Sequence, residues 1–442
     1  MVLSSTVFTP LRNFSSAQFT SQDVLVLVGE LFGRGYANGL LDEAKRCGMK
    51  VIGTTVGRRD RDKSLRKLTE EELSTLEDSL GGKVINVPLE AGFDLDIPED
   101  GQTVCDMLQG LKKDNWDKLK LDWNKVENCK KLGRDRFLNS LKEVVRELEG
   151  LVLDGGNVYF AHVMAGGIPR AKIMMPVANR VFKGYGERYL SSKHYWDSDL
   201  GKLCAQSFEE VTANTFQHLL DVTAGIRDQV ESAGSSVFYS AYGYHGTEVL
   251  QGNQYQWQSY IPYKQGEAKV LLEQHAIKAR NQGIAATVFN CPEIRTNSSD
   301  VFSGVELSLF FLFDALRKEA SDSSWIEELI RKEKSRLLSD EMWNEIEQKL
   351  KVFSEHPEIK ELMKYELWPA DNSPVTSELF IRTSEEILKL HKDPKDLISD
   401  SLSQLVVEST GKLILSSMFE TMEPVLWLGH DIIAKELNSR LS

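Results

Sequence analysis

The sequence contains short apolar runs separated by stretches in which apolar residues recur at helical spacing. The first run is VLVLV at residues 24–28, and a second, MKVIGTT, covers residues 49–55. Between them, glycines lead into YANGLLDEAKRCG, a segment with helical periodicity. A continuous apolar run is typical of a parallel strand buried on both faces. Strand, glycine turn, helix and strand in this order predict a βαβ unit.

The same alternation continues to about residue 320. Further strands are predicted at residues 83–88, 157–163, 235–240 and 284–289. Helical stretches are predicted at residues 106–150, 202–232 and 266–282. This alternation predicts an α/β fold, a Rossmann-like doubly wound parallel sheet.

Three regions are predicted along the chain. Residues 1–22 form an N-terminal extension, and residues 23–320 form the Rossmann-like domain with a helical insertion around residues 106–150. Residues 321–442 form an added helical C-terminal region, because Glu, Lys and Leu recur there at helical spacing. This last region is a candidate surface for a homo-oligomer.

Composition and charge narrow the class of protein. The net charge of -13 argues against nucleic-acid binding, which needs a basic face. The 5 cysteines contain no CxxC pair, so we expect neither a metal site nor a disulfide framework. Reduced cysteines of this kind are typical of a cytoplasmic protein, which is the localisation we expect. No apolar run approaches the roughly 20 residues of a membrane helix.

The glycine turn is the first candidate for chemistry. Gly29, Gly33 and Gly35, with Arg34 between the last two, follow the first strand and precede a helix. Glycines let the backbone approach a pyrophosphate, and the helix N-terminus offers free N–H groups to the anion. The GxxxGxG spacing is that of short-chain dehydrogenases and predicts a nicotinamide cofactor. An ordinary glycine-rich turn is the alternative interpretation.

Two arginines follow the second strand. NAD-binding enzymes commonly place an acid near this point for the ribose 2′-hydroxyl. Here the first charged residues are Arg58 and Arg59, which would suit a 2′-phosphate. The sequence therefore favours NADPH, with NADH as the alternative. A solvated basic loop would also explain the pair.

A tyrosine–lysine pair is sought in residues 238–269. The chemistry of this fold needs a tyrosine hydroxyl beside the reacting oxygen and a lysine that holds the nicotinamide ribose. Tyr260 and Lys264 have YxxxK spacing, and Tyr260 and Lys269 have Y-x8-K spacing. Spacing alone leaves both pairs open.

Three short segments resemble the enoyl-acyl-carrier-protein (trans-2-enoyl-CoA) reductases with Y-x8-K spacing. They are the G-x-A-K of Gly266–Lys269, the Y-x-G-x-E of Tyr244–Glu248 and the P-I-R-T ending in Pro292–Thr296. The resemblance covers roughly residues 23–320. It implies a catalytic Tyr260 and a Lys269 that binds the cofactor, with Tyr244 near the substrate carbonyl.

The resemblance also assigns cofactor contacts after two strands. Pro292 and Thr296 follow the sixth strand and would contact the cofactor. After the fourth strand the family has Asn-Asn-Ala-Gly, whereas this chain has AHVMAG, and Ala161 and His162 are assigned to the cofactor there. The stretch from Tyr244 to Tyr260 is also about six residues longer than the family pattern. These departures leave the substrate and cofactor less defined than the reaction class.

The resemblance implies NAD(P)H-dependent reduction of a trans-2-enoyl-thioester, on carrier protein or CoA, in fatty-acid synthesis. Residues 301–314 form an apolar helix that could line an acyl pocket or simply pack in the core. One alternative is a ketoreductase of the same fold that uses Tyr260, Lys264 and Ser240. Separately, Asn214 lies where short-chain dehydrogenases place an asparagine that takes part in a proton relay. A second alternative is a nucleotide-binding pseudo-enzyme whose helical tail binds a partner.

Overall fold

The fold is seen in a computed structural model. The structure describes residues 8–14, 17–31, 33–99, 101–152, 155–252, 254–258, 266–302, 304–321 and 323–442. The predicted Tyr260 and Lys264 lie outside these residues.

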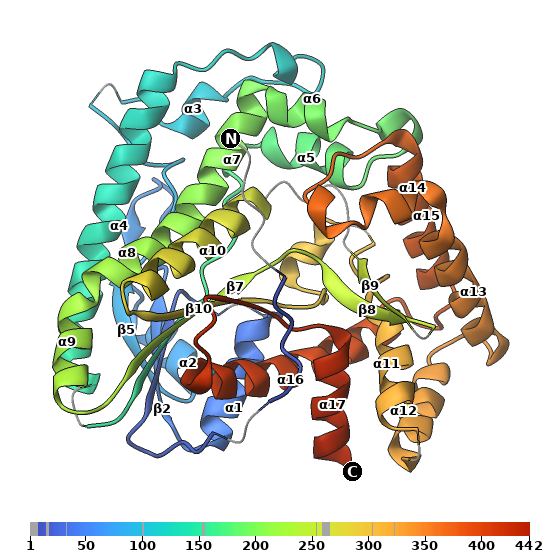
Figure 1. The fold of residues 1–442 in the computed structure, drawn as a ribbon. Coiled ribbons are helices and arrows are strands. Elements are labelled where there is room, and N and C mark those ends of the chain that lie inside the picture. The colour runs from blue at the N-terminus through green and yellow to red at the C-terminus, as the bar shows by residue number, and fades with distance from the viewer. Residues whose placement is uncertain are drawn as a thin grey trace.

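The strands confirm the predicted sheet. They are β1 (Val24–Val28), β2 (Lys50–Thr55), β5 (Lys83–Pro88), β6 (Val158–His162), β7 (Val237–Gly243), β10 (Ala285–Asn290) and β11 (Val425–Trp427). Within the described residues they form one 7-stranded sheet in the order β11-β10-β7-β6-β1-β2-β5 (Figure 1). Every pairing is parallel, and Val24 lies opposite Lys50 on one side and Val158 on the other.

Helices connect the strands and cover the sheet. Up to the sixth strand they are α1 (Tyr36–Arg46), α2 (Glu70–Leu80), α3 (Val104–Met107), α4 (Trp123–Val152), α5 (Met174–Phe182), α6 (Ser192–Asp197), α7 (Asp199–Phe208), α8 (Thr215–Val222), α9 (Ala224–Ser232) and α10 (Gly266–Asn281). The later helices are α11 (Leu312–Glu319), α12 (Ser324–Lys334), α13 (Glu341–Glu355), α14 (Pro357–Leu362), α15 (Pro374–Leu388), α16 (Ile398–Glu420) and α17 (His430–Leu441).

The continuous apolar runs are explained by helices on both faces of the sheet. Alternate residues of β1 point to opposite faces, so Leu25 belongs to one apolar cluster and Val26 to another. The Val26 cluster includes residues of α4, α8, α9 and α10. The Leu25 cluster includes residues of α1, α2, α11, α13, α16 and α17. The sheet is therefore doubly wound, as predicted.

Helices α1 and α16 meet at two glycines. A Cβ atom added at Gly39 would lie 1.9 Å from the Val407 carbonyl oxygen, and one added at Gly411 would lie 2.1 Å from Gly39. Only glycine allows such a close approach of two helix backbones. The helix that follows the glycine turn is therefore packed directly against the C-terminal region.

The C-terminal region also contributes a strand that the sequence pattern does not predict. Residues 425–427 form β11, which pairs with β10 at the edge of the sheet. Most of the region is helical, as expected, and lies at the right and bottom of Figure 1. The proposed boundary at residue 320 stays a prediction, although the sheet extends across it.

Two further local predictions need correction. Residues 247–258, taken as part of the tyrosine stretch, contain a hairpin of β8 (Thr247–Gln251) and β9 (Gln254–Gln258). Residues 301–314 are not one helix, because α11 begins only at Leu312 after turns and a short 3-10 segment. Near the arginines, β3 (Arg58–Arg59) and β4 (Leu65–Arg66) form a small antiparallel pair.

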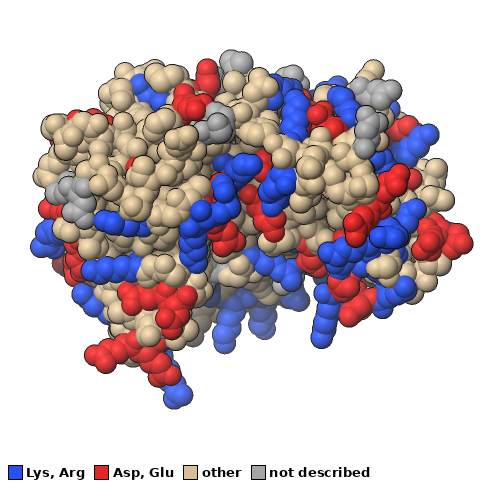
Figure 2. Space-filling model, turned by 90° about the horizontal axis from the view of Figure 1, so that it is seen from below, with Lys and Arg blue, Asp and Glu red and all other residues tan. Residues whose placement is uncertain are grey.

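The charged surface shows both signs together. On the face seen in Figure 2, Lys and Arg side chains are interspersed with Asp and Glu side chains. Among the described residues, no helix is both long and apolar enough to cross a membrane. The described residues also contain no group of His, Cys, Asp and Glu side chains placed to hold a metal ion.

Candidate functional site

A cavity of about 390 Å³ lies where β1, β6, β7 and β10 end. Ligands of open α/β sheets bind at this edge, at the point where the strand order reverses. The reversal here is between β1 and β6, which are neighbours in the sheet. Five of the predicted site residues line the cavity, and they come from four separate segments: Arg34, Gly35, Tyr244, Lys269 and Thr296.

The glycine turn adopts the backbone that its glycines allow. Gly29 has a φ of 116° and Gly33 a φ of 44°, both in the region that favours glycine. A Cβ atom at Gly29 would lie 2.9 Å from Met164, so a larger residue would clash there. Asn297, from the loop after β10, contacts Gly33 and accepts a hydrogen bond of 3.3 Å from the Arg34 amide. A residue that follows β10 therefore stabilises the glycine turn that follows β1.

The N-terminus of α1 faces the cavity. Gly35 precedes the helix, and a Cβ atom placed there would meet nothing within 4 Å. Residues 35–38 all line the cavity. The N-terminus of α1 therefore borders open space, and the partial positive charge of a helix N-terminus favours a bound phosphate. The guanidinium of Arg34, which also lines the cavity, forms an ion pair with Asp400 at 2.8 Å.

The two arginines after β2 are each paired with a carboxylate. Arg58 donates two hydrogen bonds to Glu30, of 2.8 and 3.0 Å. Glu30 follows the first glycine of the turn and also accepts from the Thr55 hydroxyl at 2.5 Å. It is buried and lines the cavity. The acid that binds Arg58 thus comes from the end of β1 instead of β2.

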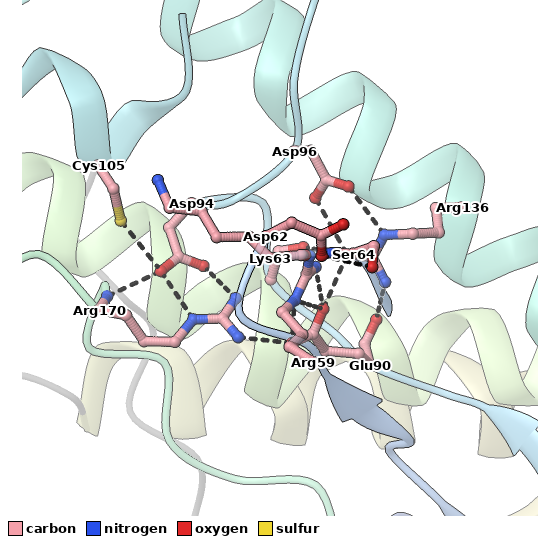
Figure 3. A network of polar contacts seen from close by, with 11 residues as sticks. Arg59, Asp62, Lys63, Ser64, Glu90, Asp94, Asp96, Cys105, Arg136 and Arg170 are labelled. Atoms are coloured by element: carbon pink, nitrogen blue, oxygen red, sulfur yellow. Dashed lines mark hydrogen bonds and ion pairs between the residues drawn. The ribbon is translucent and has the colours of Figure 1, made fainter. Parts of the chain in front are cut away.

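Arg59 belongs to a network of ion pairs (Figure 3). It donates to Glu90, which also binds Arg170 at 2.5 Å. Arg170 reaches Asp94 at 2.7 Å. Neither Arg58 nor Arg59 lines the cavity in this structure, and the prediction that they bind a 2′-phosphate is untested.

The residues after the fourth strand lie deeper than expected. Ala161 and His162 are buried within β6, and the His162 ring lies 2.8 Å from the Thr215 hydroxyl of α8. Burial lowers the pKa of His162 to about 3, so the ring is neutral near pH 7. The cavity is lined instead by Val163, Ala165 and Gly166.

Lys269 lies in the first turn of α10, and its ammonium group is near the cavity. The Nζ atom donates a 2.6 Å hydrogen bond to the carbonyl oxygen of Tyr242 at the end of β7. Burial lowers the pKa of Lys269 to about 8, while Cys291 and Glu273 act in the opposite direction. Gly266 begins this helix against the Trp368 ring, where a Cβ atom would lie 2.1 Å away. The G-x-A-K glycine therefore allows α10 to approach Trp368.

Tyr244 points to a carboxylate that the sequence pattern does not single out. Its hydroxyl donates a 2.5 Å hydrogen bond to Oε1 of Glu293, which follows β10. Glu293 also accepts hydrogen bonds from the hydroxyls of Thr247 and Ser308. Burial raises the pKa of Glu293 to about 7, although the hydrogen bonds from the Tyr244 and Ser308 hydroxyls act in the opposite direction. The one available signal was an acid within the P-I-R-T-like segment, where the family pattern has none.

Four further residues near the site are buried or bound to neighbouring groups. His245 is buried against the Trp368 ring, with 4.0 Å between ring centroids, and burial lowers its pKa to about 3. The Asn214 amide donates to Glu210 at 3.0 Å and does not line the cavity. Ser240 is buried within β7. The carbonyl of Pro292 accepts from the Tyr36 hydroxyl.

The apolar segment after β10 borders two cavities. Phe302 and Val305 line the cavity that contains Lys269. Phe310, Phe311 and Phe313 line a second cavity of about 490 Å³ beneath the β8–β9 hairpin. Of residues 301–314, only the first part, with Phe302 and Val305, lines the cavity that contains Lys269 and is therefore placed to form the expected acyl pocket.

Comparisons with known proteins point to one family. A family model described as "Enoyl-acyl carrier protein reductase FabMG" matches residues 7–437. A solved apo structure of FabMG is 49% identical, with a TM-score of 0.94, over 98% of this chain and 97% of that chain. An NADH-bound structure of FabMG is 42% identical, with a TM-score of 0.76, over 98% and 99% of the two chains. No curated protein matches the chain.

Proposed function

The chain belongs to the FabMG family of enoyl-acyl carrier protein reductases, and on that premise we propose that its reaction takes place in the cavity at the ends of β1, β6, β7 and β10. Membership makes the chain an oxidoreductase that reduces enoyl-thioesters on the acyl carrier protein in fatty-acid synthesis. The observation that supports the location is the convergence of Gly35, Tyr244 and Lys269 on one cavity.

The cavity has the features that a nicotinamide dinucleotide needs. The N-terminus of α1 would take the pyrophosphate, and the space beside Gly35 leaves room for it. Lys269 would bind the nicotinamide ribose, which places its positive charge beside the reacting atoms. The cofactor supplies the hydride when bound, and a related structure of this family contains NADH.

NADH is the cofactor that the charges favour, although the arginines alone had favoured NADPH. Arg58 already forms two hydrogen bonds with Glu30, and Arg59 is paired with Glu90. A 2′-phosphate would have to separate one of these pairs and would also meet the Glu30 carboxylate. A ribose 2′-hydroxyl can donate to that carboxylate instead.

The substrate would lie between Lys269 and the apolar residues Phe302 and Val305. Tyr244 lines the same cavity and has a hydroxyl that can donate to the thioester oxygen, where negative charge develops during reduction. Tyr260 keeps the role that the resemblance assigned to it as a prediction. The family favours enoyl reduction over the ketoreductase alternative.

A side-by-side assay tests this function. Purified protein is given NADH or NADPH with crotonyl thioester or acetoacetyl thioester, each on CoA and on carrier protein. We expect oxidation of NADH with the crotonyl thioester and much slower oxidation with the acetoacetyl one. Turnover with the ketone alone, or binding of cofactor without any turnover, would contradict the proposal.

A further inference from the structure

Glu293 is a buried carboxyl group with an unusual set of partners. It lines the cavity with only 2% of its surface exposed. Its hydrogen-bond partners are the hydroxyls of Tyr244, Thr247 and Ser308, where a buried carboxylate would ordinarily need a cation. Ionising such a group costs free energy, so the carboxyl group can hold a proton inside the site.

The hydrogen bonds indicate which oxygen carries that proton. The Thr247 hydroxyl accepts a 3.0 Å bond from the Glu293 amide, so its own hydrogen is free to be donated to Oε2. The Ser308 hydroxyl donates to the same oxygen at 3.0 Å. Oε2 is therefore occupied as an acceptor. The carboxyl proton belongs on Oε1, the atom that is 2.5 Å from the Tyr244 hydroxyl oxygen.

Other charged groups around Glu293 are directed elsewhere. Lys269 lines the same cavity from α10, but its ammonium group donates to a backbone carbonyl. Arg295, two residues further along, lies 3.5 Å from Asp400. Glu248 on β8 is bound by Arg12 at 2.6 Å. Tyr244 is thus the titratable group in direct contact with Glu293 among the described residues.

We propose that Glu293 is a positioning residue that orients the Tyr244 hydroxyl and returns a proton to it during the reaction, an inference that rests on the proposed function. When Glu293 is ionised, Tyr244 donates to it and is turned from the substrate. When Glu293 is protonated, it donates to Tyr244, and the tyrosine hydrogen can be given to the thioester oxygen.

The proton balance of this step is complete. Hydride addition at the β-carbon moves the double-bond electrons onto the thioester oxygen, which becomes an enolate. That oxygen takes the proton of Tyr244, and the Tyr244 O–H bond re-forms with the proton from Oε1 of Glu293. The enol hydrogen then moves to the α-carbon, and the Glu293 carboxylate regains a proton from water. One hydride and one proton are consumed for each saturated thioester.

Glu293→Gln tests the proposal, because glutamine keeps the shape and a donor toward Tyr244 but cannot release a proton. We expect kcat at neutral pH to fall about tenfold or more. We also expect wild-type kcat to decline as the pH rises through about 7, and this decline to be absent in the variant. Infrared spectra of the free protein provide a second measurement, since the neutral carboxyl band that titrates in this range should vanish in Glu293→Gln.

Glu306→Gln is the matched control. Glu306 is also a buried carboxylate, bound by Ser384 and not part of the cavity lining, so its replacement should leave the pH profile unchanged. Tyr244→Phe removes the hydroxyl that Glu293 serves, and adding Glu293→Gln to it should have no further effect on kcat. If Glu293→Gln fails to fold, Tyr244→Phe alone should still lose the decline of kcat near pH 7, because the hydroxyl that Glu293 serves is gone.

Two outcomes would overturn the proposal: a Glu293→Gln enzyme with the wild-type pH profile, or additive losses in the double variant. Failure of the proposed function is distinguishable, because the wild-type protein would then not reduce the crotonyl thioester at all.

Discussion

The two halves of the cavity handle charge in different ways. Next to the glycine-turn half, defined by Gly29–Asn38, each of the two arginines after β2 forms an ion pair with a carboxylate. In the lysine half, defined by Tyr244, Lys269 and Glu293, the charged groups contact hydroxyls and a backbone carbonyl. Oppositely charged partners favour the ionised form of a side chain. Burial among neutral partners favours its uncharged form. The first half is therefore suited to holding a ligand and the second to moving a proton.

The largest effect is expected when the lysine half loses its cation. Lys269→Met should lower kcat/KM about 100- to 1000-fold, because ribose binding and the positive charge near the developing enolate are both lost. Steady-state kinetics and NADH titration measure the change. Lys278→Met, an exposed residue of the same helix, should have no such effect. If Lys264→Met abolishes activity and Lys269→Met does not, the assignment of the lysine is wrong.

The packing behind the glycine-turn half should be sensitive to a single methyl group. Gly39→Ala should destabilise the protein by about 3 kcal/mol, because the new Cβ meets the Val407 carbonyl of α16. Chemical denaturation measures this loss. Gly35→Ala is the matched control, since a Cβ there meets nothing and should change stability by less than about 0.5 kcal/mol. Equal stability of both variants would show that the contact with α16 does not hold the turn.

The pH dependence of stability should reveal Glu293. Its folded pKa, about 7, lies above its ordinary value of 4.5, so the folded state binds the extra proton between these two values. The free energy of unfolding of wild type, relative to Glu293→Gln, should therefore fall by about 3 kcal/mol as pH rises through this interval. Buried histidines affect both proteins equally. Parallel stability curves for the two proteins would show that Glu293 does not titrate between pH 4.5 and about 7.

The smallest effect is expected for cofactor choice. Glu30→Gln should reduce the preference for NADH over NADPH about tenfold, because Arg58 is released to bind a 2′-phosphate. The ratio of kcat/KM for the two cofactors measures this change. Glu72→Gln, which breaks a half-buried pair with Arg66, should leave the ratio unaltered. An unchanged ratio in Glu30→Gln would place the discrimination elsewhere.

Much of the fold could be predicted because parallel strands covered on both faces are continuous apolar runs. Residues 24–28, for example, coincide with β1. The strand β11 was missed because VLW is too short to give a periodic signal and follows a long helical region. The β8–β9 hairpin was missed because its polar, tyrosine-containing sequence was taken as part of the catalytic stretch.

Part of the candidate site could be proposed from the sequence, and the roles given to its residues stay predictions. Gly29, Gly33 and Lys269 follow local rules of turn geometry and spacing, and sequence reasoning can find them. The carboxylates that pair with Arg58 and contact Tyr244 come from distant segments, Glu30 and Glu293. Only the folded arrangement brings these groups together, so the arginines were interpreted as open cation sites and Glu293 was not selected.

The pH dependence of two constants in one protein tests the contrast between the halves most directly. The dissociation constant for NADH and kcat for the crotonyl thioester would be measured together across the pKa of Glu293, near 7. We predict a nearly constant dissociation constant at pH values below the pKa of Lys269, about 8, because this cofactor-binding lysine keeps its charge there, and a kcat that declines as pH rises through about 7. A dissociation constant that titrates in this range while kcat stays constant would contradict the account.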